Sequence, residues 1–417
     1  MTFDANIASL LTDAHAHPTD DPRLRAGDEQ GLQDLAQRLC EVPLGRVCAM
    51  SSCSGDQELV RNLALEVRRL QAEGSSKESS MDLRPCFGYH PWYSHTISLD
   101  DEVTSREDHY RSLLIDSRST LQAKEELEAL LPHLPPPRSL KAILSELRTH
   151  LEEFPSALLG EVGLDRAFRI PAAKHVVQDQ PSEQGLLDSQ PPINEHTLAL
   201  RGKRLTTLSV PIEHQLKVVL AQIGVAVDLG RSVSFHSVRA PEATIQLLKE
   251  SCRVYNGANG RAFRDICLDL HSCTLSEEMI SAILRTHPNV FVSFSVTINL
   301  RQKSLASQLS VVPPTRLLIE SDWHTAGDLA ERNYEMLKMA TPYVLREEPG
   351  ACNDGGDVNE AAKLIAHNWE RFDRSLAQRR GDVDMENDGD DDELEEASHK
   401  TIRKFEANWW KQMKCLR

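Results

Sequence analysis

Two histidines near the N-terminus have the spacing of a chelating pair. His15 and His17 lie in the segment DAHAH (residues 13–17), which follows the apolar pair Leu10 and Leu11. An apolar run of this kind favours a short buried strand, and residues two apart in a strand point to the same side. Two neutral imidazoles held this way suit Zn, Mn, Fe, Co or Ni once carboxylates or further histidines complete the site. By itself, the pair is equally consistent with two polar residues at the end of a strand.

Four more ionisable residues could complete such a site. Each follows an apolar run whose length would bring it to the mouth of a barrel, and they are Glu161, His236, His271 and Asp322. Burying one such group without a partner is costly, so six groups at one mouth must be satisfied together, which metal ions do most simply. Any one of the six taken alone would be an ordinary core or rim residue.

The donor set indicates one or two divalent ions, such as Mg, Mn or Zn. Glu161 could bridge two ions, and the other ligands would then divide into His15, His17 and Asp322 on one ion and His236 and His271 on the other. Two ions lower the pKa of a shared water molecule and bind the attacking and leaving oxygen atoms of a phosphate ester. Asp322, beside that water, would accept its proton as general base. The pattern predicts a metal-dependent hydrolase with Asp322 and Glu161 in catalytic roles.

The elements that must position these residues alternate along the chain. Eight apolar runs predict strands within residues 10–17, 45–52, 84–91, 157–165, 231–238, 265–273, 289–296 and 316–324. Helical periodicity lies between them, notably in residues 57–72, 139–153, 211–229, 241–251 and 276–286. Eight strands alternating with helices predict an α/β fold, the (β/α)8 TIM barrel, in which the C-terminal ends of the strands form one active-site face.

Two long stretches interrupt this alternation. Residues 94–138 contain a candidate helix over 117–131 and a Pro-rich segment over 134–137, and residues 166–208 are rich in Pro, Gln and Ser. Both leave from the C-terminal ends of predicted strands, so either could line a substrate cleft. For most of their length, however, the composition favours surface loops.

The C-terminal part of the chain differs in charge from the rest. The predicted barrel domain, residues 8–378, closes with helices over 328–339 and 359–376, and a segment over 379–398 is then predicted to be disordered because it is too acidic to pack. This segment carries ten of the acidic residues behind the net charge of −16, so the remaining chain is only mildly acidic and offers no general nucleic-acid-binding surface. Residues 399–417 predict an amphipathic helix whose Trp409 and Trp410 could dock on the barrel or bind a partner protein.

The composition also indicates the compartment. Nine cysteines without CxxC pairs, and an N-terminus without the regions of a signal peptide, predict an intracellular protein with reduced thiols. The longest apolar stretch, residues 218–229, is short and contains Gln222 and Asp228, so no membrane span is expected. Clusters of Lys and Arg typical of targeting signals are absent, so the prediction is cytoplasm, nucleus or both.

Six motifs, in this order, resemble those of the TatD family of metal-dependent deoxyribonucleases, within the amidohydrolase-like barrels, and in particular its divergent fungal members. They are DAHAH (13–17), GYHPWY (88–93), GEVGLD (160–165), SFHS (234–237), LHS (270–272) and IESD (319–322), and they span most of residues 8–340. The resemblance implies a TIM barrel with a one- or two-metal site on the residues assigned above. It also implies phosphodiester hydrolysis, often as a 3′ to 5′ exonuclease, with single-stranded DNA or 3′ ends as substrate.

The resemblance further implies how substrate is held. His90 matches the Gly-x-His-Pro segment of the family, where an imidazole could contact the scissile phosphate. Trp92 could stack on a base, as aromatic side chains do with single strands, or could pack at the rim. The family often places Arg two residues after the histidine of the fifth strand; this chain has Val238 there and Arg239 one position later, which makes Arg239 the predicted substrate-binding residue.

Departures from the family pattern leave two other function classes open. After Asp322, family members commonly continue with Pro and a basic segment that helps to hold substrate, whereas this chain has Trp323, His324 and Thr325. A barrel with this change could act mainly as a protein-interaction adaptor. A metal-dependent amidohydrolase acting on a small molecule is a third reading, which the GYHPW and GEVGLD segments and the lack of Lys at the fourth-strand position disfavour.

Overall fold

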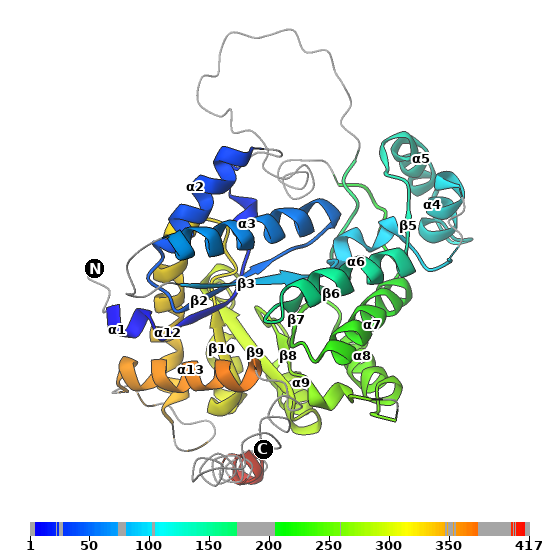
Figure 1. Ribbon diagram of the computed structural model, residues 1–417. Helices are drawn as coiled ribbons and strands as arrows, with labels where there is room; N and C mark the ends of the chain where they lie inside the picture. The colour runs from blue at the N-terminus through cyan, green and yellow to red at the C-terminus, as the bar shows by residue number, and fades with distance from the viewer. Residues whose placement is uncertain are drawn as a thin grey trace, which may run out of the picture.

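Eight parallel strands form a barrel around which the rest of the chain is arranged (Figure 1). In this computed structural model they pair in the order β1 (Thr12–Ala16), β2 (Arg46–Met50), β3 (Asp82–Phe87), β6 (Leu158–Asp165), β7 (Val233–Val238), β8 (Leu268–Leu270), β9 (Val290–Ser295) and β10 (Leu317–Glu320). The backbone N–H of Asp322 donates to the carbonyl of His15 (2.9 Å), and that of His17 donates to the carbonyl of Trp323 (2.8 Å). These bonds join the last strand to the first, and the predicted TIM barrel is confirmed.

The structure describes most of the chain. The described residues are 5–21, 23–24, 28–73, 81–101, 105–172, 205–258, 260–346, 348, 353, 356–373, 402, 404 and 406–412. The acidic segment predicted over residues 379–398 lies outside them, as does most of the second insertion.

Helices cover the outside of the barrel (Figure 1). The principal ones are α2 (Glu29–Cys40), α3 (Ser54–Glu73), α6 (Leu140–Glu153), α7 (Ile212–Leu229), α8 (Pro241–Val254), α9 (Glu277–Thr286), α12 (Leu329–Val344) and α13 (Val358–Asp373). Because helices cover the strands outside and side chains fill the barrel inside, every residue of β1, β6, β8, β9 and β10 is buried. In α9, Ile280, Ile283 and Leu284 form the buried stripe, and the Ser276 side chain accepts from the N–H of Met279 to cap the helix.

Seven of the eight predicted strand runs contain one strand each, the third overlaps β3, which begins two residues earlier, and the helices predicted over the outer layer form with their ends shifted by a few residues. Helix α2 is an addition that the sequence analysis did not predict. Shorter elements complete the order: α1 (Ala5–Ala8), α10 (Val296–Asn299) and α11 (Leu305–Val311), with single turns η1 (Pro18–Asp20), η2 (Pro91–Thr96), η4 (Phe263–Asp265), η5 (Pro314–Arg316) and η6 (Ala326–Asp328).

The first insertion is not the surface loop that its composition favours. It contains α4 (Arg106–Leu114), α5 (Leu121–Leu130), the turn η3 (Leu131–His133) and a short parallel pair, β4 (Ile97–Ser98) with β5 (Arg138–Ser139). Tyr110 and Leu127 form a small core of their own, which Ile170 and Leu208 join from the two ends of the second insertion. The apolar positions of α4 and α5 are diluted by charged residues, which is why the polarity of this stretch was misleading.

The N-terminal end of the barrel is closed by the C-terminal part of the chain. Trp369 and Phe372 of α13 pack with Cys48, Cys86 and Cys267 inside this end. Residues 406–412 are helical and also pack back on the barrel. Their Trp409 is 1% exposed, so the docking alternative holds for this side chain.

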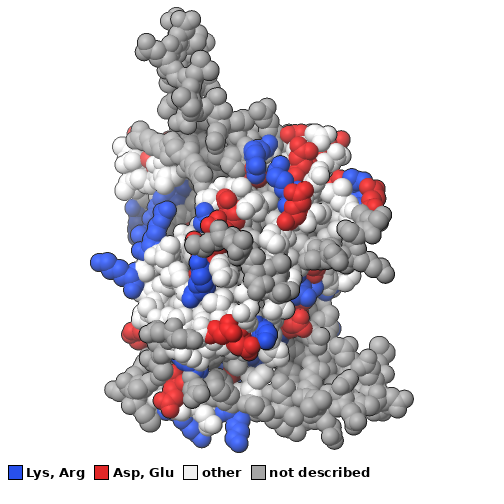
Figure 2. Space-filling model, turned by 90° about the vertical axis from the view of Figure 1, so that its left-hand side faces the viewer, with Lys and Arg blue, Asp and Glu red and all other residues white. Residues whose placement is uncertain are grey.

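Charge is mixed over the surface that Figure 2 draws. Lys and Arg side chains on this face are interspersed with Asp and Glu, and neither sign forms a continuous surface. Among the described residues, no helix is long and apolar enough to cross a membrane.

Candidate metal centre

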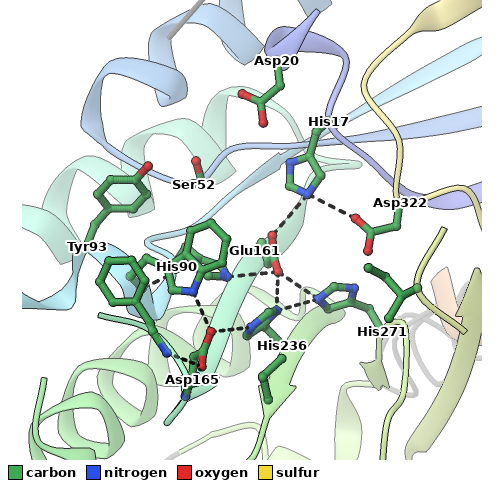
Figure 3. A pocket seen from close by; sticks show the side chains of 15 residues that line it. His17, Asp20, Ser52, His90, Tyr93, Glu161, Asp165, His236, His271 and Asp322 are labelled. Carbon is green, nitrogen blue, oxygen red and sulfur yellow. Dashed lines mark hydrogen bonds and ion pairs between the residues drawn. The ribbon is translucent and has the colours of Figure 1, made fainter. Parts of the chain in front are cut away.

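The carboxylate of Glu161 lies in a cavity of about 590 Å³ at the C-terminal mouth of the barrel (Figure 3). Glu161 belongs to β6 and is buried. Three imidazole nitrogen atoms approach its Oε1: Nδ1 of His236 and Nε2 of His271 at 2.8 Å each, and Nε2 of His90 at 3.2 Å. One oxygen atom of the carboxylate is thus surrounded by three nitrogen donors from three different strands or strand ends.

The second oxygen atom of Glu161 faces the N-terminal histidine pair. Nε2 of His17 lies 3.3 Å and Nε2 of His15 lies 3.5 Å from Oε2. These two Nε2 atoms are 3.1 Å apart, so the rings converge on one point, as strand parity predicts. Oδ1 of Asp322 completes this side at 3.7 Å from Nε2 of His17. The six predicted ligands are therefore brought together.

A glycine allows β6 and β7 to approach closely enough to place His236. A Cβ atom built on Gly163 would lie 2.1 Å from the carbonyl oxygen and 2.7 Å from the Cβ atom of His236. Only the absence of a side chain at this position permits the observed register, in which Gly163 pairs with His236. The glycine of the GEVGLD motif thus positions a donor on the neighbouring strand.

Asp322 reaches the mouth through a local change of backbone direction. Its φ of 48° lies in the left-handed region, directly after β10 ends. Its Oδ2 lies 3.1 Å from the Ser272 hydroxyl oxygen, which is also 2.6 Å from Oε1 of Glu320. Asp322 thus lies at the mouth of the barrel, where the general base is predicted.

Two buried carboxylates lie behind the imidazoles. Oε1 of Glu320 is 3.6 Å from Nδ1 of His271, and Oδ2 of Asp165 is 3.5 Å from Nε2 of His236. A carboxylate beside one ring nitrogen favours the proton on that atom, so the other nitrogen carries the lone pair. In both rings that other nitrogen is the one 2.8 Å from Glu161, which is the arrangement expected of metal-ligating histidines.

His90 has the opposite arrangement. Its Nδ1 accepts a hydrogen bond from the backbone N–H of Trp92 at 3.2 Å, so in the neutral ring the proton is on Nε2. This N–H points at Glu161 and lies at the mouth with the other rings. His90 is therefore better placed to donate a hydrogen bond than to ligate a metal ion.

The electrostatic environment shifts the pKa values of these groups in different directions. Burial would raise the pKa of Glu161, but the imidazoles of His90, His271 and His15 outweigh it and hold the pKa well below its usual range. Burial would lower the pKa of His17, but the hydrogen bond and charge of Glu161 raise it to about 10. Burial lowers the pKa of His90 to about 4. Glu161 is thus an ionised carboxylate, His17 is protonated when no metal ion is bound, and His90 is neutral.

The donor chemistry fits divalent metal ions. Among the described residues, four overlapping groups have ligand atoms within 4.8 Å of one another: His15, Glu161 and His271; His15, His17 and Asp322; His90, Glu161 and His236; and His271, Glu320 and Asp322. The second group is the set predicted for one ion. Imidazoles around ionised carboxylates suit Zn, Mn, Fe, Co or Ni, and a divalent ion would replace the protons that these nitrogen atoms otherwise bind.

The predicted substrate-binding residues are only partly brought to the cavity. His90 and Trp92 line it, and so does Val238. Arg239 is exposed, has a left-handed φ of 50°, and is not among the residues that line the cavity. The turn that follows β7 directs Arg239 away from the donor set.

Several residues of the site were not singled out from the sequence. Those that line the cavity are Asp20, Ser52, Tyr93, Asp165, Ala167, Phe168 and Ile298, and Glu320 lies beneath His271. Glu320 could have been found, because it stands two residues before Asp322 and its strand alternates sides. Phe168 lies in the loop after β6 and Ile298 in the four-residue helix α10 after β9, and both segments are too short to carry a periodic signal.

The fold and the donor set define a class of protein, the TIM-barrel hydrolases with a metal site at the mouth of the barrel. The family model "TatD related DNase" matches residues 12–372, so the chain belongs to the TatD family of DNases and the resemblance of its motifs is confirmed. The chain is thus a metal-dependent hydrolase acting on ester bonds.

Individual relatives agree with this assignment. The Cut9-interacting protein scn1 of Schizosaccharomyces pombe is 28% identical over 77% of this chain and 89% of its own length. The uncharacterized deoxyribonuclease YMR262W of Saccharomyces cerevisiae is 26% identical over 87% of this chain and 98% of its own. Among solved structures, a TatD-family hydrolase of Entamoeba histolytica has the same fold, with a TM-score of 0.51 at 14% identity, over 87% of this chain and 97% of that one.

Proposed function

We propose that this chain hydrolyses phosphodiester bonds of DNA, removing nucleotides from the 3′ ends of single strands. The observation that carries the proposal is the cluster of five imidazoles around Glu161 with Asp322 at the same mouth. Membership of a DNase family supports the substrate class. The direction of attack and the strand preference rest on the family resemblance and are tested separately below.

Six residues would hold one or two divalent ions in this proposal: His15, His17, Glu161, His236, His271 and Asp322. Such ions, when bound, lower the pKa of a water molecule and neutralise the charge of a phosphate. Asp322 accepts the proton of the attacking water at its carboxylate, which lies beside the Ser272 hydroxyl at the mouth of the barrel. Glu161, which is ionised and surrounded by imidazoles, keeps the histidine nitrogen atoms at their observed distances from one another.

His90 and Trp92 would contact the substrate. The Nε2–H of His90, which points at Glu161 in the structure, would donate to a non-bridging oxygen of the scissile phosphate in place of Glu161 when substrate is bound, while Nδ1 stays bound by the N–H of Trp92. Trp92 contributes an aromatic surface in the same cavity. Arg239, exposed beyond Val238, would contact a phosphate of the substrate outside the cavity.

The test is cleavage of a single-stranded oligonucleotide by metal-stripped protein that is re-supplied with Mg, Mn or Zn. We expect cleavage to return with at least one metal and to be lost in Asp322→Asn. Asp228→Asn, an exposed carboxylate of α7 that pairs with Arg148, is the control and should cleave like the wild type. Cleavage by Asp322→Asn at the wild-type rate would refute the role of Asp322 as general base. Wild-type protein that binds metal but does not cleave DNA would refute the proposed nuclease activity.

Direction is tested with end-protected strands. Phosphorothioate linkages at the 3′ end should block degradation, and the same linkages at the 5′ end should not. Degradation that is blocked only by 5′ linkages would reverse the direction, and degradation that neither modification blocks would indicate an endonuclease.

An adaptor role is a second candidate, because one relative is by name a Cut9-interacting protein. The chain would then bind a Cut9-like protein inside the cell, in the cytoplasm, the nucleus or both. The buried face of residues 406–412 is already used by the barrel, so the partner would contact other parts of the C-terminal segment. If Asp322→Asn binds such a partner as the wild type does, hydrolysis and binding are separate functions.

A further inference from the structure

Two aromatic rings form one wall of the cavity that contains the donor set. The rings of Trp92, in η2, and Phe168, just after β6, are nearly parallel, with centroids 5.4 Å apart and planes 15° apart. Both residues line the cavity together with Val238 and Ile298. The cavity thus combines a polar centre around Glu161 with an aromatic and aliphatic surface.

A single carboxylate holds both rings. Oδ2 of Asp165 accepts the indole N–H of Trp92 at 2.6 Å, and Oδ1 accepts the backbone N–H groups of Ala167 at 2.6 Å and of Phe168 at 3.0 Å. Asp165 is 5% exposed, so these bonds are shielded from water. It therefore fixes the indole through its side chain and the phenyl ring through the turn that carries it.

The same carboxylate ties this pair to the donor set. Oδ2 of Asp165 lies 3.5 Å from Nε2 of His236, whose Nδ1 is 2.8 Å from Glu161. The indole also meets the ring of His90 edge-on, with centroids 4.7 Å apart. Figure 3 shows His90, His236 and Asp165 joined in this way around Glu161. These buried contacts therefore fix the distance between the two aromatic rings and the donor set around Glu161.

We propose that Trp92 and Phe168 together form a platform that binds the base of the nucleotide next to the scissile bond. Asp165 is the positioning residue that holds this platform at a fixed position relative to His236. The inference rests on the proposed function and specifies its substrate: an end nucleotide with an unpaired base rather than a phosphate ester in general. Stacking on aromatic side chains accepts any base, because every base has a π-face, so little sequence preference is expected.

The closing experiment measures binding before hydrolysis, so that it does not depend on turnover. Binding of thymidine 5′-monophosphate and of 2-deoxyribose 5-phosphate, which lacks the base, is compared by calorimetry on the metal-loaded wild type. The nucleotide should bind roughly 10- to 100-fold more tightly. Equal affinity, or no binding of either compound, would overturn the platform.

Variants assign the preference to the rings. Phe168→Ala should bring the two affinities within about threefold and keep the binding of the base-free phosphate. Ile298→Ala removes a similar apolar contact from the same cavity without removing a ring, and its affinity ratio should stay that of the wild type. If the affinity ratio fell equally in both variants, the preference for the nucleotide would come from the apolar lining in general, and stacking would be refuted.

The role of Asp165 is tested by coupling. Asp165→Ala and Trp92→Phe each remove the hydrogen bond to the indole N–H, so their effects on the affinity ratio should not add in the double variant. Additive effects would refute the positioning role. Hydrolysis of a strand with an abasic end then separates the two claims: a preference in binding without any hydrolysis would refute the proposed function and leave the platform standing.

Discussion

Glu320 lies directly behind His271, with its Oε1 atom 3.6 Å from Nδ1 of the ring, at the point where β10 ends. It is fully buried and accepts hydrogen bonds from the hydroxyl groups of Ser272 and Ser293 at 2.6 Å each. A carboxylate in this position orients a metal-ligating histidine and increases its basicity.

Glu320→Gln should therefore weaken metal binding although Glu320 is not one of the six predicted ligands. We expect the affinity for Zn or Mn to fall roughly 10- to 100-fold with the fold retained, as removal of such an outer carboxylate typically does. Calorimetric titration of metal into stripped protein measures the change. Glu360→Gln, on the exposed face of α13, is the control, and indistinguishable affinities of the two variants would exclude the role given to Glu320.

Metal binding should also depend on pH in a defined direction. The pKa of His17 is raised to about 10 in the protein without metal, chiefly because Glu161 outweighs the effect of burial. A ligating nitrogen must lose its proton, so below pH 10 each unit of rising pH makes the neutral ring about tenfold more abundant. Affinity should increase with pH over this range, and ion binding should release protons.

Calorimetry in two buffers of different protonation enthalpy counts these protons. Near neutral pH, the wild type should release about one proton from His17 for the ion that this ring binds. His17→Ala should release about one fewer. Proton release that is the same in both proteins would show that His17 is neutral or is no ligand.

Gly163 offers a test of how the strands set the site. A methyl group there would meet the carbonyl oxygen of His236 at 2.1 Å, so Gly163→Ala must push β6 and β7 apart. We expect a loss of roughly 1–3 kcal/mol in the free energy of unfolding, together with weaker metal binding. Urea denaturation and metal titration measure the two effects.

Gly55 provides the matched control. It begins the first turn of α3, and a Cβ atom there would have no other heavy atom within 4 Å. Gly55→Ala should be neutral or stabilise the helix by up to about 1 kcal/mol. If both alanine variants behaved alike, the close approach of the strands would not be what requires Gly163.

The convergence of the six candidate ligands could be predicted because strands impose a simple rule. His15 and His17 share a side by parity, and Glu161, His236, His271 and Asp322 each end or occupy a buried run that points to one face. The neighbours of these residues could not be predicted in the same way, because they come from distant parts of the chain. Asp165 accepts a hydrogen bond from Trp92, 73 residues away, and His271 lies beside Glu320 of another strand. Arg239 stays a prediction: it is exposed, has a left-handed backbone and does not line the cavity, and no sequence pattern indicates that turn.

The C-terminal helical residues lead to a prediction about stability. Glu406 accepts hydrogen bonds from the guanidinium of Arg316 and from the Thr315 hydroxyl, and Arg316 is 2% exposed. Trp409 is buried with the guanidinium of Arg346 4.6 Å above its ring. The segment therefore acts as part of the barrel, at the end away from the metal centre.

Glu406→Gln should lower the free energy of unfolding by about 3 kcal/mol, because it leaves a buried arginine without its charged partner. Trp409→Ala should lower it by roughly 3–5 kcal/mol through the cavity that it creates. Asn408→Ala, on the exposed side of the same helix, is the control and should change little. Hydrolysis measured well below the unfolding temperature should be the same in all three variants, since the donor set lies at the opposite mouth. If Glu406→Gln and Trp409→Ala unfolded like the control, the segment would be a detachable tail, and its tryptophans would be free for a partner protein.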